Sequence, residues 1–151
     1  DVTFGFNTAI DVVTEALDRL HTTAESHHRI MVLEVMGRYA GWIALESAIA
    51  GGADVALIPE IPYDINKAVD KINERRAKGK EFSIVVVAEG AAPKGGEITV
   101  EGKRDNGAGV DNNKLGGVGQ VVARELEKLT GLEARNTTLG YMQRVGFTPF
   151  P

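Results

Sequence analysis

Apolar residues recur along the chain in two patterns, continuous runs and stripes at helical spacing. The continuous runs lie at 30–35, 55–58 and 82–88 and predict buried strands, and we predict a short fourth strand at 136–139. The stripes predict helices, and they lie at 5–22, 39–50, 65–77 and 118–129. Strand and helix therefore alternate, which is typical of α/β proteins with a mostly parallel sheet. We predict one domain over 1–151, a three-layer α/β/α fold with a mostly parallel sheet of about four strands.

Three stretches refine this pattern. The helix at 39–50 is apolar nearly all round, which predicts burial on more than one side. The polar stretch 24–29 predicts a connection between the first helix and the first strand. The stretch 90–117 holds eight glycines and is too long for an ordinary loop, so we interpret it as an insertion. Within it, 97–101 alternates polar and apolar residues and predicts one arm of a small exposed hairpin.

Composition narrows the class of protein. Of 151 residues, 17 are basic and 21 are acidic. The sequence contains no stripe of basic residues interleaved with aromatic residues, so we expect no nucleic-acid partner. The absence of cysteine excludes disulfides and thiolate metal sites. No apolar run reaches the roughly 20 residues of a membrane span, and the first residues do not resemble a signal peptide. We therefore expect a cytoplasmic protein without a membrane partner.

Charged residues follow the predicted strands at their carboxyl ends, where ligands bind in open α/β sheets. Met36, Gly37 and Arg38 follow the first strand and stand close to the start of a helix, whose amides attract anions. Arg38 is thus either a phosphate ligand or a surface arginine. Glu89 follows the strand at 82–88, as a ligand for a sugar hydroxyl or as a loop partner, and Arg144 follows the last strand. One carboxylate and two arginines suit a phosphorylated, polyhydroxylated ligand.

Two other features of the sequence suggest weaker sites. Gly116–Gly119 opens a helix and superficially matches a dinucleotide fingerprint, but no strong strand precedes it, so we expect no dinucleotide to bind there. His27 and His28 are adjacent and point in different directions, so we expect no metal site.

Several segments together resemble the 6-phosphofructokinase family. They are Ser26–Ile30, Glu34–Gly41, Ala48–Ala53, Pro59–Glu60, Ala88–Glu89 and Leu139–Arg144. The resemblance implies phosphorylation of fructose 6-phosphate to fructose 1,6-bisphosphate in glycolysis, with Mg²⁺ and either ATP or pyrophosphate. It covers only the fructose 6-phosphate-binding second domain of a two-domain enzyme. The phosphoryl-donor motifs, including a Gly-Thr-Ile-Asp-Asn-Asp-type segment with the catalytic base, do not occur in this sequence.

The resemblance also implies roles for individual residues. Met36, Gly37 and Arg38 would line the sugar phosphate, with Arg38 as a catalytic residue that stabilises the transferring phosphoryl group. Glu89 would hold sugar hydroxyls, and Arg144 would bind the 6-phosphate.

Three further residues concern the donor and the assembly. Tyr141 stands where many ATP-dependent members have a histidine that contacts the sugar phosphate and some pyrophosphate-dependent members have tyrosine. Arg29 and Arg135 match arginines that reach into the neighbouring subunit's site, which implies a homo-oligomer, either a dimer or a tetramer.

We therefore expect a fragment that lacks the donor site, the metal ligand and the base, that binds no cofactor by itself, and that is inactive alone. The alternative is a stand-alone module that binds sugar phosphate or mediates oligomerisation without catalysis.

Overall fold

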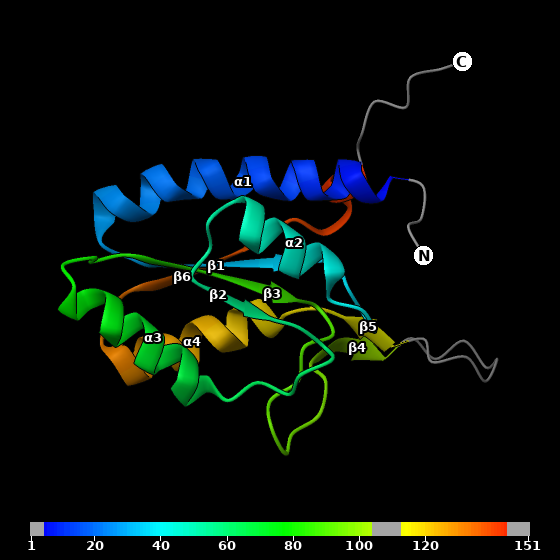
Figure 1. The fold of residues 1–151 in the computed structure, drawn as a ribbon. Coiled ribbons are helices and arrows are strands. Elements are labelled where there is room, and N and C mark those ends of the chain that lie inside the picture. Colours follow the sequence, from blue (N-terminus) through cyan, green and yellow to red (C-terminus); the bar gives the residue numbers. More distant parts are fainter. Residues whose placement is uncertain (1–4, 104–112, 145–151) are drawn as a thin grey trace.

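A computed structural model describes residues 5–103 and 113–144 (Figure 1). Its elements in order are α1 (Phe6–His27), β1 (Ile30–Val35), α2 (Trp42–Ala50), β2 (Val55–Leu57), α3 (Ile65–Ala77), β3 (Ser83–Ala88), β4 (Val100–Lys103), β5 (Asn113–Leu115), α4 (Val118–Thr130), β6 (Ala134–Thr138) and the 3₁₀ helix η1 (Gly140–Arg144).

Four of the strands form one sheet in the order β2-β3-β1-β6, and every pair in it is parallel. In the register, Val32 of β1 lies beside Val85 of β3 and Asn136 of β6. Helices α1 and α2 cover one face of the sheet, and α3 and α4 cover the other (Figure 1). This arrangement confirms the predicted three-layer α/β/α fold.

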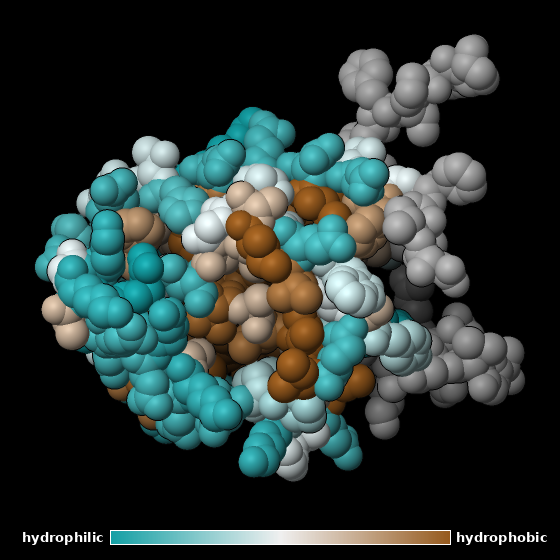
Figure 2. Space-filling view, viewed as in Figure 1, coloured by the Kyte–Doolittle hydropathy of each residue, from teal (hydrophilic) through white to brown (hydrophobic). Residues whose placement is uncertain are grey.

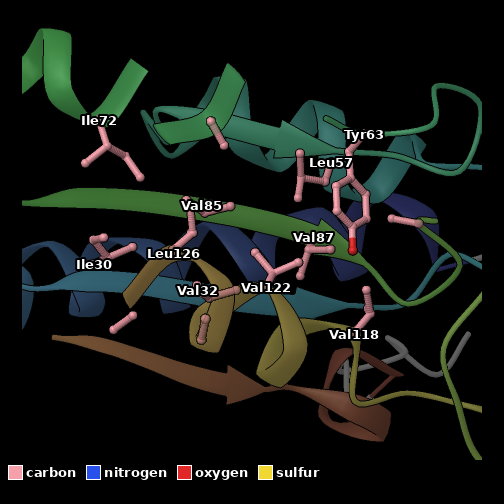
Figure 3. Close-up of a cluster of buried hydrophobic side chains, with 14 residues drawn as sticks. Ile30, Val32, Leu57, Tyr63, Ile72, Val85, Val87, Val118, Val122 and Leu126 are labelled. Carbon is pink, nitrogen blue, oxygen red and sulfur yellow. The ribbon is translucent and has the colours of Figure 1, made fainter. Parts of the chain in front are cut away.

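The core has two halves because successive strand residues point to opposite faces of a sheet. On the α1–α2 side, Leu33 and Val86 are fully buried against Leu17. On the α3–α4 side, Val32 and Val85 face the helices (Figure 3). The side chains that complete this second cluster include Ile30, Leu57, Tyr63, Ile72, Val87, Val118, Val122 and Leu126. The two central strands thus supply both halves, which explains their continuous apolar sequences.

Helix boundaries differ from the sequence prediction in two places. α1 continues to His27, so most of the predicted polar connection at 24–29 is helix. The reason is Ala24, which is fully buried and extends the inward stripe by another turn. α2 begins at Trp42 rather than at residue 39, because Gly41 is its N-cap and residues 36–41 form a longer turn.

The predicted burial of α2 on more than one side is wrong for the described structure. Its buried residues are small, namely Ala44, Ser47 and Ala48, because they pack closely over the sheet and α1. Trp42 and Ile49 point outwards, with exposed fractions of 58% and 74%. One face of this apolar helix is therefore exposed to solvent.

The insertion at 90–117 contains the predicted hairpin, formed by β4 and β5 in antiparallel pairing. Its first arm begins at Val100, three residues later than the start of the predicted arm. The middle of the insertion, 104–112, lies outside the described residues.

We expect Leu126→Ala in α4 to lower the free energy of unfolding by about 2–5 kcal/mol, because it leaves a cavity among fully buried neighbours. Leu129→Ala in the same helix is the matched control, since Leu129 is 48% exposed and its truncation costs about 0.5 kcal/mol. Urea unfolding of both variants measures the difference. Equal losses would contradict the burial of Leu126 in the core.

Candidate functional site

Three turns meet at the carboxyl ends of neighbouring strands. They follow β1, β3 and β6, which are adjacent and parallel in the sheet. We call this region the carboxyl edge and define it as residues 36–38, 89–90 and 139–144. The sequence prediction that these segments share one side of the sheet is confirmed.

The turns after β1 and β3 are joined by hydrogen bonds in both directions. The N–H of Glu89 donates to the carbonyl of Val35 at 2.9 Å, and that of Gly90 donates to the carbonyl of Gly37 at 3.0 Å. In return, the N–H of Gly37 donates to Oε1 of Glu89 at 3.4 Å. The carboxylate of Glu89 is therefore held next to the residue that precedes Arg38.

On the other side, Gln143 holds the β1 turn to η1. Its Oε1 accepts a hydrogen bond from the N–H of Met36 at 3.2 Å, and its Nε2 donates to the carbonyl of Gly140 at 3.2 Å. The side chain is only 1% exposed, so both bonds form away from solvent. Gln143 belongs to the family motif at Leu139–Arg144, but the sequence predicted no role for it. Its position beside an arginine after the last strand is the only signal for it in the sequence.

Two glycines allow the β1 and β3 turns to touch. Gly37 has φ +146°, and a Cβ there would lie 2.7 Å from the carbonyl oxygen of Ala40. A Cβ on Gly90 would lie 1.9 Å from the carbonyl oxygen of Arg38. Since real Cβ atoms do not approach backbone oxygens so closely, a side chain at either position must move the turn that carries Arg38.

Arg38 lies on this turn ahead of α2. Its guanidinium carbon is 5.9 Å from the centre of the Tyr39 ring, which is 71% exposed. The start of α2 is four residues further on, at Trp42, and not at residue 39 as the sequence predicted. The N–H of Gly41, the N-cap, donates to Oε1 of Glu60 at 2.8 Å. A carboxylate of the protein therefore already occupies the position ahead of α2 where an anion was expected.

The carboxyl edge brings together most of the predicted site. Tyr141 lies in η1 and is 78% exposed, and Arg144 is the last residue of η1. The predicted residues that share this edge are Met36, Gly37, Arg38, Glu89, Tyr141 and Arg144.

Arg29 and Arg135 lie at the opposite edge of the sheet, at the amino ends of β1 and β6. Both bind Glu133: Nε of Arg29 is 2.5 Å from its Oε2, and Arg135 contacts its Oε1. The hydrogen bond from Arg29 is the main cause that holds the pKa of Glu133 below its usual range. Burial acts in the opposite direction, and the hydrogen bond and charge of Arg135 add to the lowering. The six residues of β1 separate the two edges by roughly 16–20 Å.

Glu34 is a buried charged residue whose role sequence analysis missed. Its side chain is 2% exposed in the central strand β1. Oε2 accepts a hydrogen bond from the N–H of Gly119 at 2.7 Å, and Oε1 accepts one from Gly117 at 3.2 Å. The carboxylate thus occupies the start of α4. The sequence signal that could have indicated this role is a single acidic residue within an otherwise apolar strand.

This arrangement leaves no dinucleotide site at Gly116–Gly119, because the amides that would hold a diphosphate bind Glu34 instead. The strand before α4 is β5, which belongs to the two-stranded hairpin and not to the main sheet. Both observations agree with the sequence interpretation of this stretch.

None of the helices in 5–103 and 113–144 combines the length and apolarity needed to cross a membrane. In the same residues, no group of three or more His, Asp or Glu side chains is placed to hold a metal ion.

These features define a three-layer α/β domain whose charged carboxyl edge carries the carboxylate of Glu89 and the guanidinium of Arg38, groups that suit a polar, anionic ligand. The family model described as Phosphofructokinase matches residues 1–151. The chain belongs to the phosphofructokinase family.

Relatives with both kinds of phosphoryl donor are similar to this chain. It is 63% identical over 149 residues to ATP-dependent 6-phosphofructokinase 2 of Clostridium perfringens, covering 98% of this chain and 40% of the relative. It is 51% identical over 146 residues to the pyrophosphate–fructose 6-phosphate 1-phosphotransferase of Streptomyces coelicolor, covering 97% and 42%. The chain thus spans about two fifths of these relatives.

Solved structures share the fold. Phosphofructokinase from Saccharomyces cerevisiae superposes with a TM-score of 0.76 at 33% identity, over 95% of this chain and 17% of that one. The pyrophosphate-dependent phosphofructokinase from Nitrosospira multiformis gives a TM-score of 0.71 at 27% identity, over 90% and 32%.

We expect Gly90→Ala to lower the free energy of unfolding by about 3 kcal/mol, because the new methyl group clashes with the backbone of Arg38. Gly95→Ala is the control: it has φ +77° but open space around it, so it costs only about 1 kcal/mol of backbone strain. Urea unfolding gives the energies, and amide chemical shifts of Gly37 and Arg38 should move only in the first variant. Unmoved shifts would contradict the close contact.

We expect the carboxyl group of Glu133 to titrate below the ordinary glutamate value of about 4.3. Because its folded pKa is lowered, the stabilisation is present above the pKa of the unfolded chain and is lost as the pH falls through the folded pKa. Carboxyl-detected NMR titration measures this value. Arg29→Met should raise it more than Arg135→Met does, and the reverse order would contradict the assignment of Arg29 as the main cause.

Proposed function

We propose that this chain is the fructose 6-phosphate-binding part of a 6-phosphofructokinase, which phosphorylates fructose 6-phosphate to fructose 1,6-bisphosphate in glycolysis. The observation that carries the proposal is the mutual bonding of the Gly37 and Glu89 turns, which holds Arg38 and a carboxylate on one rigid edge. The names of the relatives support the same reaction, with ATP or with pyrophosphate as donor.

The residues of the carboxyl edge have complementary parts in this proposal. Glu89 accepts hydrogen bonds from sugar hydroxyls through the oxygen that does not bind Gly37. Arg144 binds the 6-phosphate, since a guanidinium offers several oriented donors to phosphate oxygens. Arg38 stabilises charge on the phosphoryl group during transfer, a step that depends on positioning and electrostatics. Met36, Gly37 and Tyr141 line the sugar phosphate between these charges.

The donor side of the reaction is proposed to come from sequence outside these 151 residues. No segment of the Gly-Thr-Ile-Asp-Asn-Asp type occurs in the chain, and the described residues contain no cluster suited to a metal ion. ATP or pyrophosphate, Mg²⁺ and the catalytic base therefore belong to a second domain in our proposal. This chain supplies the acceptor side.

Arg29 and Arg135 fit a role in a neighbouring subunit's site. Roughly 16–20 Å of strand separates them from the carboxyl edge, which is more than an arginine side chain can reach. Glu133 holds both guanidinium groups at one place on the surface. We propose a cytoplasmic homo-oligomer in which the amino edge of one subunit completes the sugar-phosphate site of the next.

We expect calorimetry to show heat when fructose 6-phosphate is added to the chain, and no heat with Arg38→Ala or Arg144→Ala, because Arg144 binds the 6-phosphate and Arg38 also lines the sugar phosphate. Lys128→Ala is the control, since it removes a cation from the exposed end of α4 and should leave the heat unchanged. Absence of heat with the unaltered chain at millimolar ligand would contradict sugar-phosphate binding.

The same preparation should form no fructose 1,6-bisphosphate with Mg²⁺ and either ATP or pyrophosphate, because the donor site and the base are missing. Product formed by the isolated chain would refute its assignment as an acceptor half. Binding without turnover, persisting after the chain is joined to a donor domain, would instead favour the alternative of a non-catalytic module.

A further inference from the structure

Gln143 is a buried polar side chain that bonds two separate segments of the carboxyl edge. It lies in η1 and is 1% exposed. Its side-chain oxygen accepts a hydrogen bond from the N–H of Met36, which is 107 residues away in the sequence. Its side-chain nitrogen donates to the carbonyl of Gly140, the first residue of η1. One side chain therefore joins the turn that carries Arg38 to the 3₁₀ helix that ends at Arg144.

The two partners determine the chemistry that is needed at position 143. The N–H of Met36 needs an acceptor and the carbonyl of Gly140 needs a donor, and a carboxamide supplies both. An ionised carboxylate of the same length supplies only acceptors, and a thioether supplies neither strong group. Because Gln143 is closed to solvent, water replaces a lost bond poorly and the partner stays unpaired.

Packing does not hold the turn at 36–41 on its outer side. Tyr39 is 71% exposed, and Trp42 at the start of α2 is 58% exposed. Figure 2 shows apolar side chains over α2 open at the surface. Three side chains hold the turn through its backbone N–H groups instead. Two of them, Glu89 and Glu60, come from the loops after β3 and β2, and the third, Gln143, comes from η1.

The other attachments of η1 do not involve this turn. Helix α1 packs against η1. The N–H of Leu139, just before η1, donates to the carbonyl of Glu34 in β1 at 3.2 Å. Both attachments place η1 against the rest of the domain, whereas the side chain of Gln143 sets its position relative to the turn of Arg38.

We propose that Gln143 is a positioning residue for fructose 6-phosphate. It touches no part of the ligand, and it keeps the turn of Arg38 and η1 at a fixed separation so that one sugar phosphate meets both arginines. A site whose two segments are joined before binding loses less conformational entropy when the ligand arrives. The inference rests on the proposed function, in which Arg38 and Arg144 bind the same ligand.

Two variants of similar side-chain length test this role by calorimetry with fructose 6-phosphate. Gln143→Glu keeps an acceptor for Met36 and loses the donor to Gly140, and Gln143→Met removes both bonds. Each should weaken binding of fructose 6-phosphate by about tenfold or more, because the ligand must then order the two segments itself. Urea unfolding identifies conditions under which every variant is folded.

Inorganic phosphate separates positioning from a general loss of structure. A single guanidinium can bind it, so it does not require the two segments at a fixed separation. Phosphorus NMR should therefore show a change of less than about twofold in its affinity for the Gln143 variants. Equal weakening for inorganic phosphate and fructose 6-phosphate would overturn the proposal.

Leu126→Ala is the control for lowered stability. It removes buried side-chain atoms on the α3–α4 side of the sheet and leaves both bonds of Gln143 in place. Fructose 6-phosphate should bind it within about twofold of the native affinity. The amide chemical shifts of Met36 and Gly37 should move in Gln143→Met and stay unchanged in Leu126→Ala.

A measurement on the native chain needs no variant. Saturation with fructose 6-phosphate should slow solvent exchange of the Gln143 side-chain amide protons by about tenfold, because the ligand holds both bonded segments together. Gln120 is the internal reference, since it lies exposed on α4 and its exchange should not change. Unchanged exchange at Gln143 in the saturated chain would overturn the proposal.

The calorimetric results distinguish failure of the positioning role from failure of the proposed function. Absence of binding by the native chain would refute the proposed function, and the positioning role with it. Binding by the native chain, with native affinity in either Gln143 variant, would overturn the positioning role alone. The packing of α1 against η1 would then be sufficient to order the site.

Discussion

The carboxylate of Glu34 is the constraint on which the rest of the structure depends. It is buried in the central strand, and burial of a charge is costly unless hydrogen bonds compensate it. The compensation comes from the N–H groups of Gly117 and Gly119, at the positive end of the α4 dipole. The backbone carbonyl of Glu34 also accepts from Leu139. Glu34 lies two residues before the turn at Met36. Its side chain holds the start of α4, and its carbonyl holds Leu139, the residue before η1.

Charge is divided between the two edges of the sheet. At the amino edge, Glu133 already neutralises part of the charge of Arg29 and Arg135. At the carboxyl edge, the N–H groups of Met36 and Gly37 donate to the side chains of Gln143 and Glu89. These hydrogen bonds within the protein set the geometry of the turns. The backbone that carries these side chains is therefore ordered before a ligand binds, which lowers the conformational entropy lost on binding.

Local patterns predicted the elements well because periodicity reflects burial directly. The strand at Ile30–Val35 and the helix at Ile65–Ala77, with its Asp64 cap, agree with the structure residue by residue. The roles of Glu34, Glu60 and Gln143 were not predicted, because each depends on a partner far away in the sequence. The start of α2 was predicted too early for a similar reason: Gly41 is the N-cap, and Glu60 binds its amide.

The carboxyl edge is assembled from parts that are remote along the chain. The bond between Gly37 and Glu89 spans 52 residues, and that between Met36 and Gln143 spans 107. Neither bond can form until β1, β3 and β6 lie side by side. Ligand binding at this edge is therefore coupled to folding of the domain. A ligand bound only by the folded form at 100 times its dissociation constant would therefore add about 2.7 kcal/mol to the stability of the whole sheet. The supply of such a ligand would then affect how long the folded chain survives proteolysis.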